Sequence, residues 1–443
     1  MGLRLLPKTF DPPELGEEGS VKIGTQVYES LLGYHPFARP YQLMPVLAES
    51  MPEVSEDRLT YTFRMKQGVT FVDDPCFPDG QGREVTAEDL LYVLKRFSHP
   101  DILGTGWWLL DGKVEGLNDW RDQLRRDITE ARERGEDVGE LWGIERPVEG
   151  LEVVDRYTFR FHLTQPYPQF LWILSMPYTA LYPHEAVEYY GKEWRNHPVG
   201  TGPFRLVEYN PVYRAVLEAN PEYREVRVPD PRNEPGQRWE GWEEDEAKGL
   251  LVNAGERIPL LDGIEIRFLL EDQPRWLYFK AGYLDFLNPP KDNTAEVIIG
   301  DGLSPLMQER GVTMTPFNEL GTVYSCLNTE DELLSNVELR RAMALAFDHK
   351  WTVEHLYSGQ AVVATSLIPP GVAGYDPDYH PYHSEDGTSQ VDRARAAMVR
   401  AGYPEGIDPD TGRAIRVRFD NSGAGVTARH FAQRFVDDMR KIG

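Results

Sequence analysis

The sequence predicts an α/β protein built from two or more lobes. Its 443 residues exceed what a single hydrophobic core ordinarily contains. Segments that alternate apolar and polar residues, the pattern of half-buried strands, are separated along the chain by segments with apolar residues at helical spacing. Strands interleaved with helices are typical of partly parallel sheets covered by helices. The composition, 41% hydrophobic and 27% charged, is that of a folded protein.

Elements of the first half can be located from periodicity and from helix-start signals. Apolar and polar residues alternate at 59–65 and again at 157–163, so both segments are predicted strands. Thr86 is followed three residues later by Asp89, a pattern that resembles a capping box and predicts the start of a helix. The other elements expected in this half are a helix at 23–34 and a solvated helix or helical hairpin in the charge-rich run 121–140.

The second half continues the alternation of strands and helices. The segment 229–256 is rich in Pro, Gly and acidic residues and is predicted to be a surface insertion. The chain ends in a helix without the strand that normally follows in an α/β unit, so we expect the last lobe to be incomplete. The predicted strands are 204–209, 214–219, 264–270, 323–328 and 415–419, and the predicted helices are 275–283, 337–357, 391–401 and a final one containing Phe431, Phe435, Met439 and Ile442.

Charge and hydropathy exclude several classes of protein. Lys and Arg number 47 against 72 Asp and Glu, a net charge of −25 that repels phosphate backbones, so we expect no nucleic-acid partner. No apolar stretch approaches the roughly 18 residues of a membrane span. Residues 1–7 have too short an apolar run for a secretion signal. Either the protein is cytoplasmic or its signal is not present in this chain.

The residues that could carry chemistry do not form a recognised catalytic or metal motif. Two distant thiols, Cys76 and Cys326, cannot make a zinc-finger site; Cys326 is predicted to be buried, and a disulfide between the two stays open. Residues 200–203 lack the spacing and Lys of a phosphate loop, and residues 408–412 depart from a calcium loop, so both are predicted turns. The ten histidines show no metal-ligand spacing. We expect a protein without metal or cofactor, and not an enzyme.

Several short motifs follow one another in an order that carries a resemblance. They include Thr60-Tyr61-Thr62-Phe63-Arg64-Met65-Lys66-Gln67-Gly68-Val69-Thr70-Phe71, Gly200-Thr201-Gly202-Pro203-Phe204, Ala281-Gly282-Tyr283-Leu284-Asp285 and Ala401-Gly402-Tyr403-Pro404-Glu405-Gly406. In this order they resemble the family 5 extracellular solute-binding proteins of ABC importers, which capture peptides and other small solutes such as nickel complexes. The matches extend from about residue 23 to the end, so the chain is identified as a member of that family.

The resemblance implies a periplasmic-binding-protein fold of type II. In this fold two α/β lobes are joined by a hinge, and an extra α+β subdomain is attached to the first lobe. The domains expected on this basis are lobe I at 1–50 and 175–322 with the insertion 229–256, the extra subdomain at 51–174 with a helical insertion at 101–147, and lobe II at 323–443, incomplete at its C-terminus.

The resemblance also implies a function and its partners. A peptide or similar small solute would be enclosed between the lobes by hinge closure and delivered to an ABC permease in the membrane. The protein would be a monomer, periplasmic or extracellular, with lipid or membrane attachment left open. Two alternatives remain: a ligand-sensing module of a larger protein, and a hydrolase that uses paired carboxylates.

Three candidate ligand contacts are polar residues at expected lobe edges. Tyr28 and Glu29 lie at the start of the first lobe, where a carboxylate could accept a hydrogen bond from a ligand amine; the alternative is a glutamate on a helix surface. Asn328, at the end of a predicted strand, could bond either ligand or hinge backbone.

The other candidates are an aromatic pair and a cation. Trp107 and Trp108 follow two glycines and could stack on a ligand, although packing within the inserted segment explains them better. Arg340, together with Arg341, could pair with a ligand carboxylate; the alternative is pairing with Glu338 or Asp348.

Overall fold

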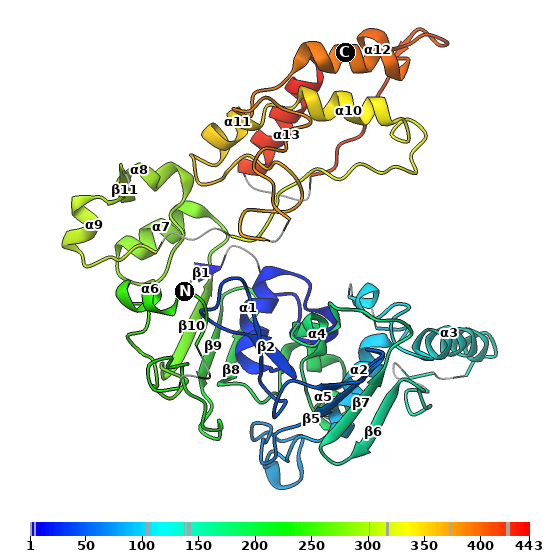
Figure 1. The fold of residues 1–443 in the computed structure, drawn as a ribbon, viewed down its shortest axis with the longest axis vertical. Coiled ribbons are helices and arrows are strands. Elements are labelled where there is room, and N and C mark those ends of the chain that lie inside the picture. Colours follow the sequence, from blue (N-terminus) through cyan, green and yellow to red (C-terminus); the bar gives the residue numbers. More distant parts are fainter. Residues whose placement is uncertain are drawn as a thin grey trace. The chain divides into compact units, whose positions relative to one another are not determined.

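The computed structural model divides into two compact units, described separately here (Figure 1). Unit 1 comprises residues 1–270 and 284–286, and unit 2 comprises 271–283 and 287–443. The structure describes the whole chain except residues 1, 4, 5, 103, 105, 137, 140–142, 235, 237, 301, 316–318, 373 and 422–425.

The first sheet of unit 1 has four strands in the order β1-β10-β9-β8. Its first pair is parallel and the other two are antiparallel. The predicted strands at 204–209, 214–219 and 264–270 are confirmed as three of its members. The helix α1 (Glu18–Val27) packs on β8, and its Ile23 and Val27 are fully buried. The strand bounds are β1 Gly2–Leu3, β8 Phe204–Asn210, β9 Arg214–Ala219 and β10 Gly263–Phe268.

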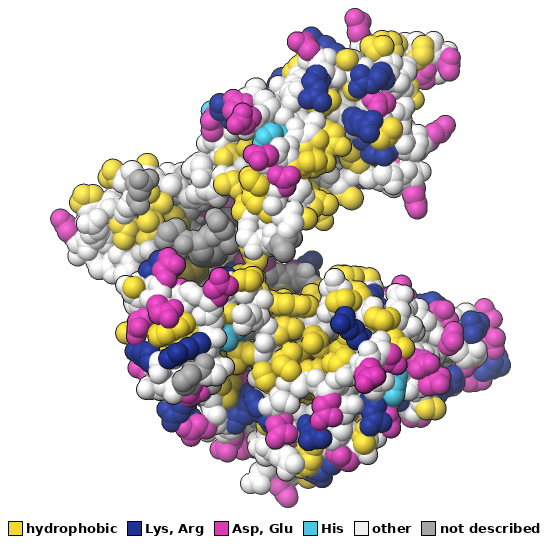
Figure 2. Space-filling view, viewed as in Figure 1, with side chains coloured by type: hydrophobic (Ala, Val, Ile, Leu, Met, Phe, Trp, Pro, Cys, Tyr) yellow, Lys and Arg dark blue, Asp and Glu magenta, His cyan; other side chains and the backbone are white. Residues whose placement is uncertain are grey.

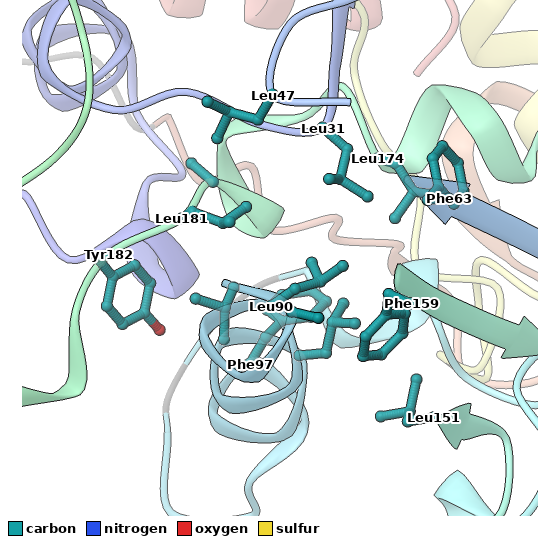
Figure 3. Close-up of a cluster of buried hydrophobic side chains, with 14 of the residues drawn as sticks. Leu31, Leu47, Phe63, Leu90, Phe97, Leu151, Phe159, Leu174, Leu181 and Tyr182 are labelled. Carbon is teal, nitrogen blue, oxygen red and sulfur yellow. The ribbon is translucent and has the colours of Figure 1, made fainter. Parts of the chain in front are cut away.

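The second sheet of unit 1 is antiparallel throughout, in the order β4-β5-β7-β6. Alternate residues face the core: Phe63 on β5 lies opposite Phe159 on β7, and both are fully buried. The helix α2 (Ala87–Ser98) contacts β6 and β7, and together they enclose the largest core (Figure 3). The strands are β4 Glu53–Val54, β5 Thr60–Arg64, β6 Leu151–Asp155 and β7 Thr158–His162, of which β6 was not predicted.

The predicted helix at 23–34 is wrong in its second half. α1 ends at Val27, Tyr28 has extended backbone, and the chain then enters the hairpin β2 (Leu32–Tyr34) and β3 (Leu43–Pro45). Pairing with β3 fixes residues 32–34 as a strand, so tertiary contacts override a spacing that also fits a helix. Two short helices complete this part of unit 1: α4 Phe170–Ile173 and α5 His184–Tyr190.

The charge-rich run forms a solvated helix, as predicted. α3 (Leu117–Glu133) buries one apolar stripe, including Leu124 and Ile128, and exposes most of its charged residues. The segment 229–256, predicted to be a surface insertion, exposes most of its described residues and contains one short helix, α6 (Trp242–Ala247). An isolated bridge between Arg227 and Arg257 brings the two ends of this insertion together.

Unit 2 is organised around helices. α10 packs closely on α12, and Leu339, Ala342 and Met398 form part of the core between them, to which Phe435 of α13 also contributes. Its helices are α7 Asp272–Lys280, α8 Thr294–Val297, α9 Pro305–Glu309, α10 Val337–Ala346, α11 His349–Trp351, α12 Val391–Ala401 and α13 Val426–Met439; its strands are β11 Ile298–Ile299, β12 Gly302–Leu303, β13 Ile407–Asp408 and β14 Arg413–Ala414.

Two strands predicted for unit 2 are absent. Residues 323–328 and 415–419 form no ladder, because no other strand among the described residues lies beside them. The prediction that Cys326 is buried is also wrong: without a neighbouring strand to cover it, this thiol is exposed. Cys76 and Cys326 are both free, so the structure contains no disulfide between them.

The predicted helix at 337–357 is interrupted. Phe347 leaves the helical region at the end of α10, and the Asp348 side chain accepts a hydrogen bond from the Trp351 amide, which starts α11. A π-helical turn at Thr352–Leu356 follows. The interruption allows Phe347 to pack against Phe431 and Phe435 of α13.

Candidate functional site

Glu29 is the centre of a buried polar cluster in unit 1. Its Oε2 accepts hydrogen bonds from Arg224 Nη1 at 2.6 Å and from Thr201 Oγ1 at 2.8 Å. Its Oε1 accepts from Arg224 Nη2 and from Tyr223 OH, both at 2.9 Å. The side chains of Glu29 and Arg224 are only 9% and 17% exposed. The carboxylate is therefore held by four donors from the same unit.

The turn at 200–203 presents Thr201 to this cluster. The Gly202 amide donates to the carbonyl of Val27 at 2.8 Å, so the turn lies directly against the end of α1. A Cβ on Gly200 would lie 2.2 Å from the Val27 carbonyl oxygen, a distance that no side chain could occupy. Residues 201–203 form bends that lie against α1, in keeping with the predicted turn.

Burial and the contacts with Glu29 shift the pKa values of Arg224 and Tyr223. Burial alone would lower the pKa of Arg224, but the hydrogen bonds and the charge of Glu29, together with Tyr223, outweigh burial and raise the pKa. Burial and the neighbouring carboxylate of Glu29 also raise the pKa of Tyr223. The two parallel contacts between the Arg224 guanidinium and the Glu29 carboxylate have the geometry of a structural ion pair.

A hollow of about 440 Å³ adjoins the cluster. Arg224 and Lys66 line it as cations and Glu49 as an anion. The ammonium of Lys66 donates to the Val46 carbonyl at 2.8 Å, and burial, followed by repulsion from Arg224, lowers its pKa. Sequence reasoning did not select Lys66 or Arg224, because they are brought together only by the fold.

Tyr28 and the tryptophan pair occupy different environments. Tyr28 is 4% exposed and packs edge-on against Tyr182 and Trp194 in the core. Trp107 is half-buried, and the Arg121 guanidinium lies over its ring at 4.5 Å. Trp108 is 62% exposed. Of the aromatic candidates, Trp108 therefore offers the most accessible ring.

In unit 2, the predicted contacts Asn328 and Arg340 form hydrogen bonds with backbone groups of residues nearby in the chain. Asn328 is exposed, and its side-chain oxygen accepts from the Glu330 amide at 3.0 Å. Arg340 donates to the carbonyls of Leu334 and Ser335 at 2.7 and 2.9 Å, which fastens the loop before α10. Arg341 pairs with Glu338, the structural alternative given above.

The described residues contain no group of three or more His, Cys, Asp or Glu side chains placed to hold a metal ion. At 408–412, Asp408 accepts from the Asp410 amide and the Thr411 hydroxyl, which is the geometry of a turn, as predicted.

In the part of the chain that is described, none of the helices combines the length and the apolar character needed to cross a bilayer.

Comparison with known proteins places the chain among binding proteins. A family model described as "Bacterial extracellular solute-binding proteins, family 5 Middle" matches residues 42–443. The glutathione-binding protein GsiB of Salmonella typhimurium is 24% identical over 399 residues, which cover 90% of this chain and 60% of that protein. The di/tripeptide-binding protein 2 of Pseudomonas aeruginosa is 25% identical over 453 aligned positions, covering 99% of this chain and 69% of that protein.

Solved structures share the fold. The periplasmic binding protein DppA of Helicobacter pylori, in complex with the peptide STSA, matches all of this chain and 71% of its own with a TM-score of 0.67 and 18% identity. The murein tripeptide binding protein MppA of Escherichia coli matches all of this chain and 72% of its own with a TM-score of 0.70 and 18% identity. These matches confirm the predicted periplasmic-binding-protein fold.

The chain spans about 60% of the length of the GsiB proteins that it matches. The family is defined by solute binding and not by a reaction, which confirms the prediction that the protein is not an enzyme. With a family model matched over residues 42–443, the chain belongs to the bacterial extracellular solute-binding proteins of family 5.

Proposed function

We propose that the protein captures a short peptide or a peptide-like solute and delivers it to an ABC permease. The observation that carries this proposal is the length of the family match, which runs through both units from residue 42 to residue 443. Relatives named for di- and tripeptides and for glutathione, itself a tripeptide, favour this class of ligand.

The division of the chain supports capture by closure. The boundary between the units is crossed three times, at 270–271, 283–284 and 286–287. In a hinge, a few loop or element-terminal residues absorb the change in backbone angles on closure. Residues near 270–287 would then form the hinge of this protein.

Among the predicted ligand contacts, exposure favours Trp108 and Asn328. Glu29 and Arg340 are engaged by their own units, and Tyr28 lies in the core. We propose that Trp108 and Asn328 remain available to a solute, whereas Glu29 shapes unit 1 through Arg224. We propose that the protein acts as a monomer outside the cytoplasm; the similar protein DppA is named a periplasmic binding protein.

The test is calorimetric titration of the complete gene product with reduced glutathione and with the tripeptide Ala-Ala-Ala. Saturable binding of either, accompanied by a rise in the melting temperature, supports peptide capture. If neither tripeptide binds nor shifts the melting temperature, the proposal is wrong. If only a non-peptide solute binds and raises the melting temperature, the ligand of this protein is not a peptide, and the proposal is wrong in its ligand class.

A further inference from the structure

Three aromatic rings from three segments of unit 1 meet at its surface. Tyr34 ends β2, Tyr41 precedes β3, and Trp172 belongs to α4. The Tyr34 ring lies 5.8 Å from Tyr41 and 5.4 Å from Trp172, measured between centroids. Tyr34 is 51% exposed, and the other two are half-buried. We call these three residues the aromatic platform. Figure 2 shows apolar side chains gathered on unit 1 where β2 and α4 lie.

A cation borders the aromatic platform. The guanidinium of Arg39 lies over the Tyr41 ring at 4.2 Å from its centroid. One of its nitrogens, Nη1, donates to the Ala38 carbonyl at 2.7 Å, and within the described part of the chain Arg39 forms no ion pair. The platform therefore combines ring faces with one positive charge at its edge.

The backbone under the rings is held by several hydrogen bonds. Tyr34 is paired with Leu43 in the β2–β3 hairpin, and the His35 amide donates to the Gln42 carbonyl at 2.9 Å. Nδ1 of His35 accepts from the amides of Phe37 and Ala38, at 3.3 and 3.0 Å, which folds the loop 35–42 back on itself. The Leu32 amide donates to the Leu174 carbonyl at 3.2 Å and joins β2 to the end of α4.

The surface insertion 229–256 packs against the loop 35–42. Its Trp239 is 4% exposed and stacks on Phe37, with centroids 5.2 Å apart and ring planes at 15°. Trp239 also contacts the ring of His35 at 5.0 Å, and Ala38 is fully buried in the same small core. This packing gives the insertion a physical role: it holds the loop that carries Arg39 and Tyr41.

Exposed aromatic rings that are held rigidly are suited to binding, because little conformational entropy is lost when a ligand covers them. Aromatic pairs contribute beyond the area that they bury, and an adjacent cation attracts a further ring face. We propose that the aromatic platform binds an aromatic side chain of the captured solute, and that the insertion 229–256 positions it. This inference rests on the proposed function of peptide capture.

The experiment compares two tripeptides, Ala-Phe-Ala and Ala-Ala-Ala, by calorimetric titration of the complete gene product. We expect the wild type to bind the phenylalanine peptide about three- to tenfold more tightly, the range that one aromatic contact supplies. Tyr34→Ala should remove that preference, so that the ratio of the two affinities approaches one. Trp239→Phe, which keeps an apolar ring under the loop, should reduce the preference less than Trp239→Ala.

Tyr213→Ala is the matched control. Tyr213 is 53% exposed on the same unit and also has an arginine, Arg214, beside its ring at 5.8 Å, but it lies in the β8–β9 hairpin. This variant should keep the preference for the phenylalanine peptide. Thermal unfolding of each variant shows that it is folded.

The possible failures are distinguishable. If the wild type binds both peptides equally, or if Tyr34→Ala keeps the preference, the aromatic platform is not the contact while peptide capture stands. If neither peptide binds the wild type, the platform is overturned, and the proposed function is overturned with it only when reduced glutathione also fails to bind.

Discussion

Arg224 and Glu29 form a two-pronged ion pair across 195 positions of the sequence. The two terminal nitrogens of the guanidinium contact the carboxylate, at 2.6 and 2.9 Å, in a nearly buried setting. The pair joins the loop between α1 and β2 to the segment after β9. Its first consequence is for stability.

Removing the cation should destabilise the protein strongly. Arg224→Met leaves the Glu29 carboxylate buried without a countercharge, and such losses cost about 3–5 kcal/mol of unfolding free energy. Urea unfolding followed by circular dichroism measures the change. The double variant Glu29→Gln with Arg224→Met should recover part of the loss, since no charge then remains buried. An Arg224→Met protein as stable as the wild type would contradict the structural role.

Gly200 should tolerate no side chain. A methyl group at this position would meet the Val27 carbonyl oxygen at 2.2 Å, so the turn must move away from α1. We expect Gly200→Ala to lower the unfolding free energy by about 1–3 kcal/mol, as overpacking does. Gly302→Ala is the control, because a Cβ there meets nothing within 4 Å. Equal melting temperatures for the two variants would show that Gly200 does not lie this close to the Val27 carbonyl.

The start of α2 depends on the Thr86 side chain. Thr86 and Asp89 have the arrangement of a capping box: Oδ2 of Asp89 accepts from the Thr86 amide at 2.8 Å and from the Thr86 hydroxyl at 3.2 Å. Thr86→Ala should cost about 0.5–2 kcal/mol, whereas Thr86→Ser, which retains the hydroxyl, should cost much less. Thermal unfolding of the two variants decides between a hydroxyl effect and a general effect of substitution.

His349 should make the protein sensitive to acid. Burial, reinforced by the nearby His383, lowers its pKa from 6.5 to about 4, against the opposing pull of Asp348 and Asp438. Below pH 6.5 the unfolded chain takes up a proton that the folded protein does not, so stability falls as the pH drops towards about 4. The loss attributable to this residue is roughly 1–3 kcal/mol.

The free energy of unfolding is measured at about pH 7.5 and at about pH 4.5, because most of the expected loss of stability from His349 falls between these two values. His349→Gln should show a smaller loss between the two values than the wild type. His184→Gln, a change at a histidine that is 45% exposed, serves as the control and should retain the wild-type loss. Identical pH profiles for the wild type and His349→Gln would contradict the assignment.

Local patterns predicted the elements whose formation depends on neighbouring residues. The strands near 59–65 and 157–163 alternate in sequence, and in the structure they pair with Tyr61 opposite Phe161. The helix at 391–401 has the bounds that its spacing and its Gly402 cap predict. These features are encoded within one turn or one strand, so the sequence alone predicts them.

The remaining features of the fold and of the candidate site depend on contacts between residues that are far apart in the sequence. Residues 323–328 have the composition of a strand, but a strand needs a neighbour for its backbone groups, and no periodicity reports whether one exists. The partner of Glu29 could not be predicted because no spacing rule connects positions 29 and 224. The convergence of Tyr34, Tyr41 and Trp172 likewise follows from the fold, so the aromatic platform escaped sequence reasoning.

The bridge between Arg227 and Arg257 has a consequence for how this protein could change over generations. Because the two ends of the segment 229–256 already lie side by side, the segment can be gained, shortened or exchanged without altering the register of β9 against β10. A single genetic event at this position would leave the sheet intact and alter only the support beneath the loop 35–42. Ligand preference could in this way evolve separately from the scaffold that carries it.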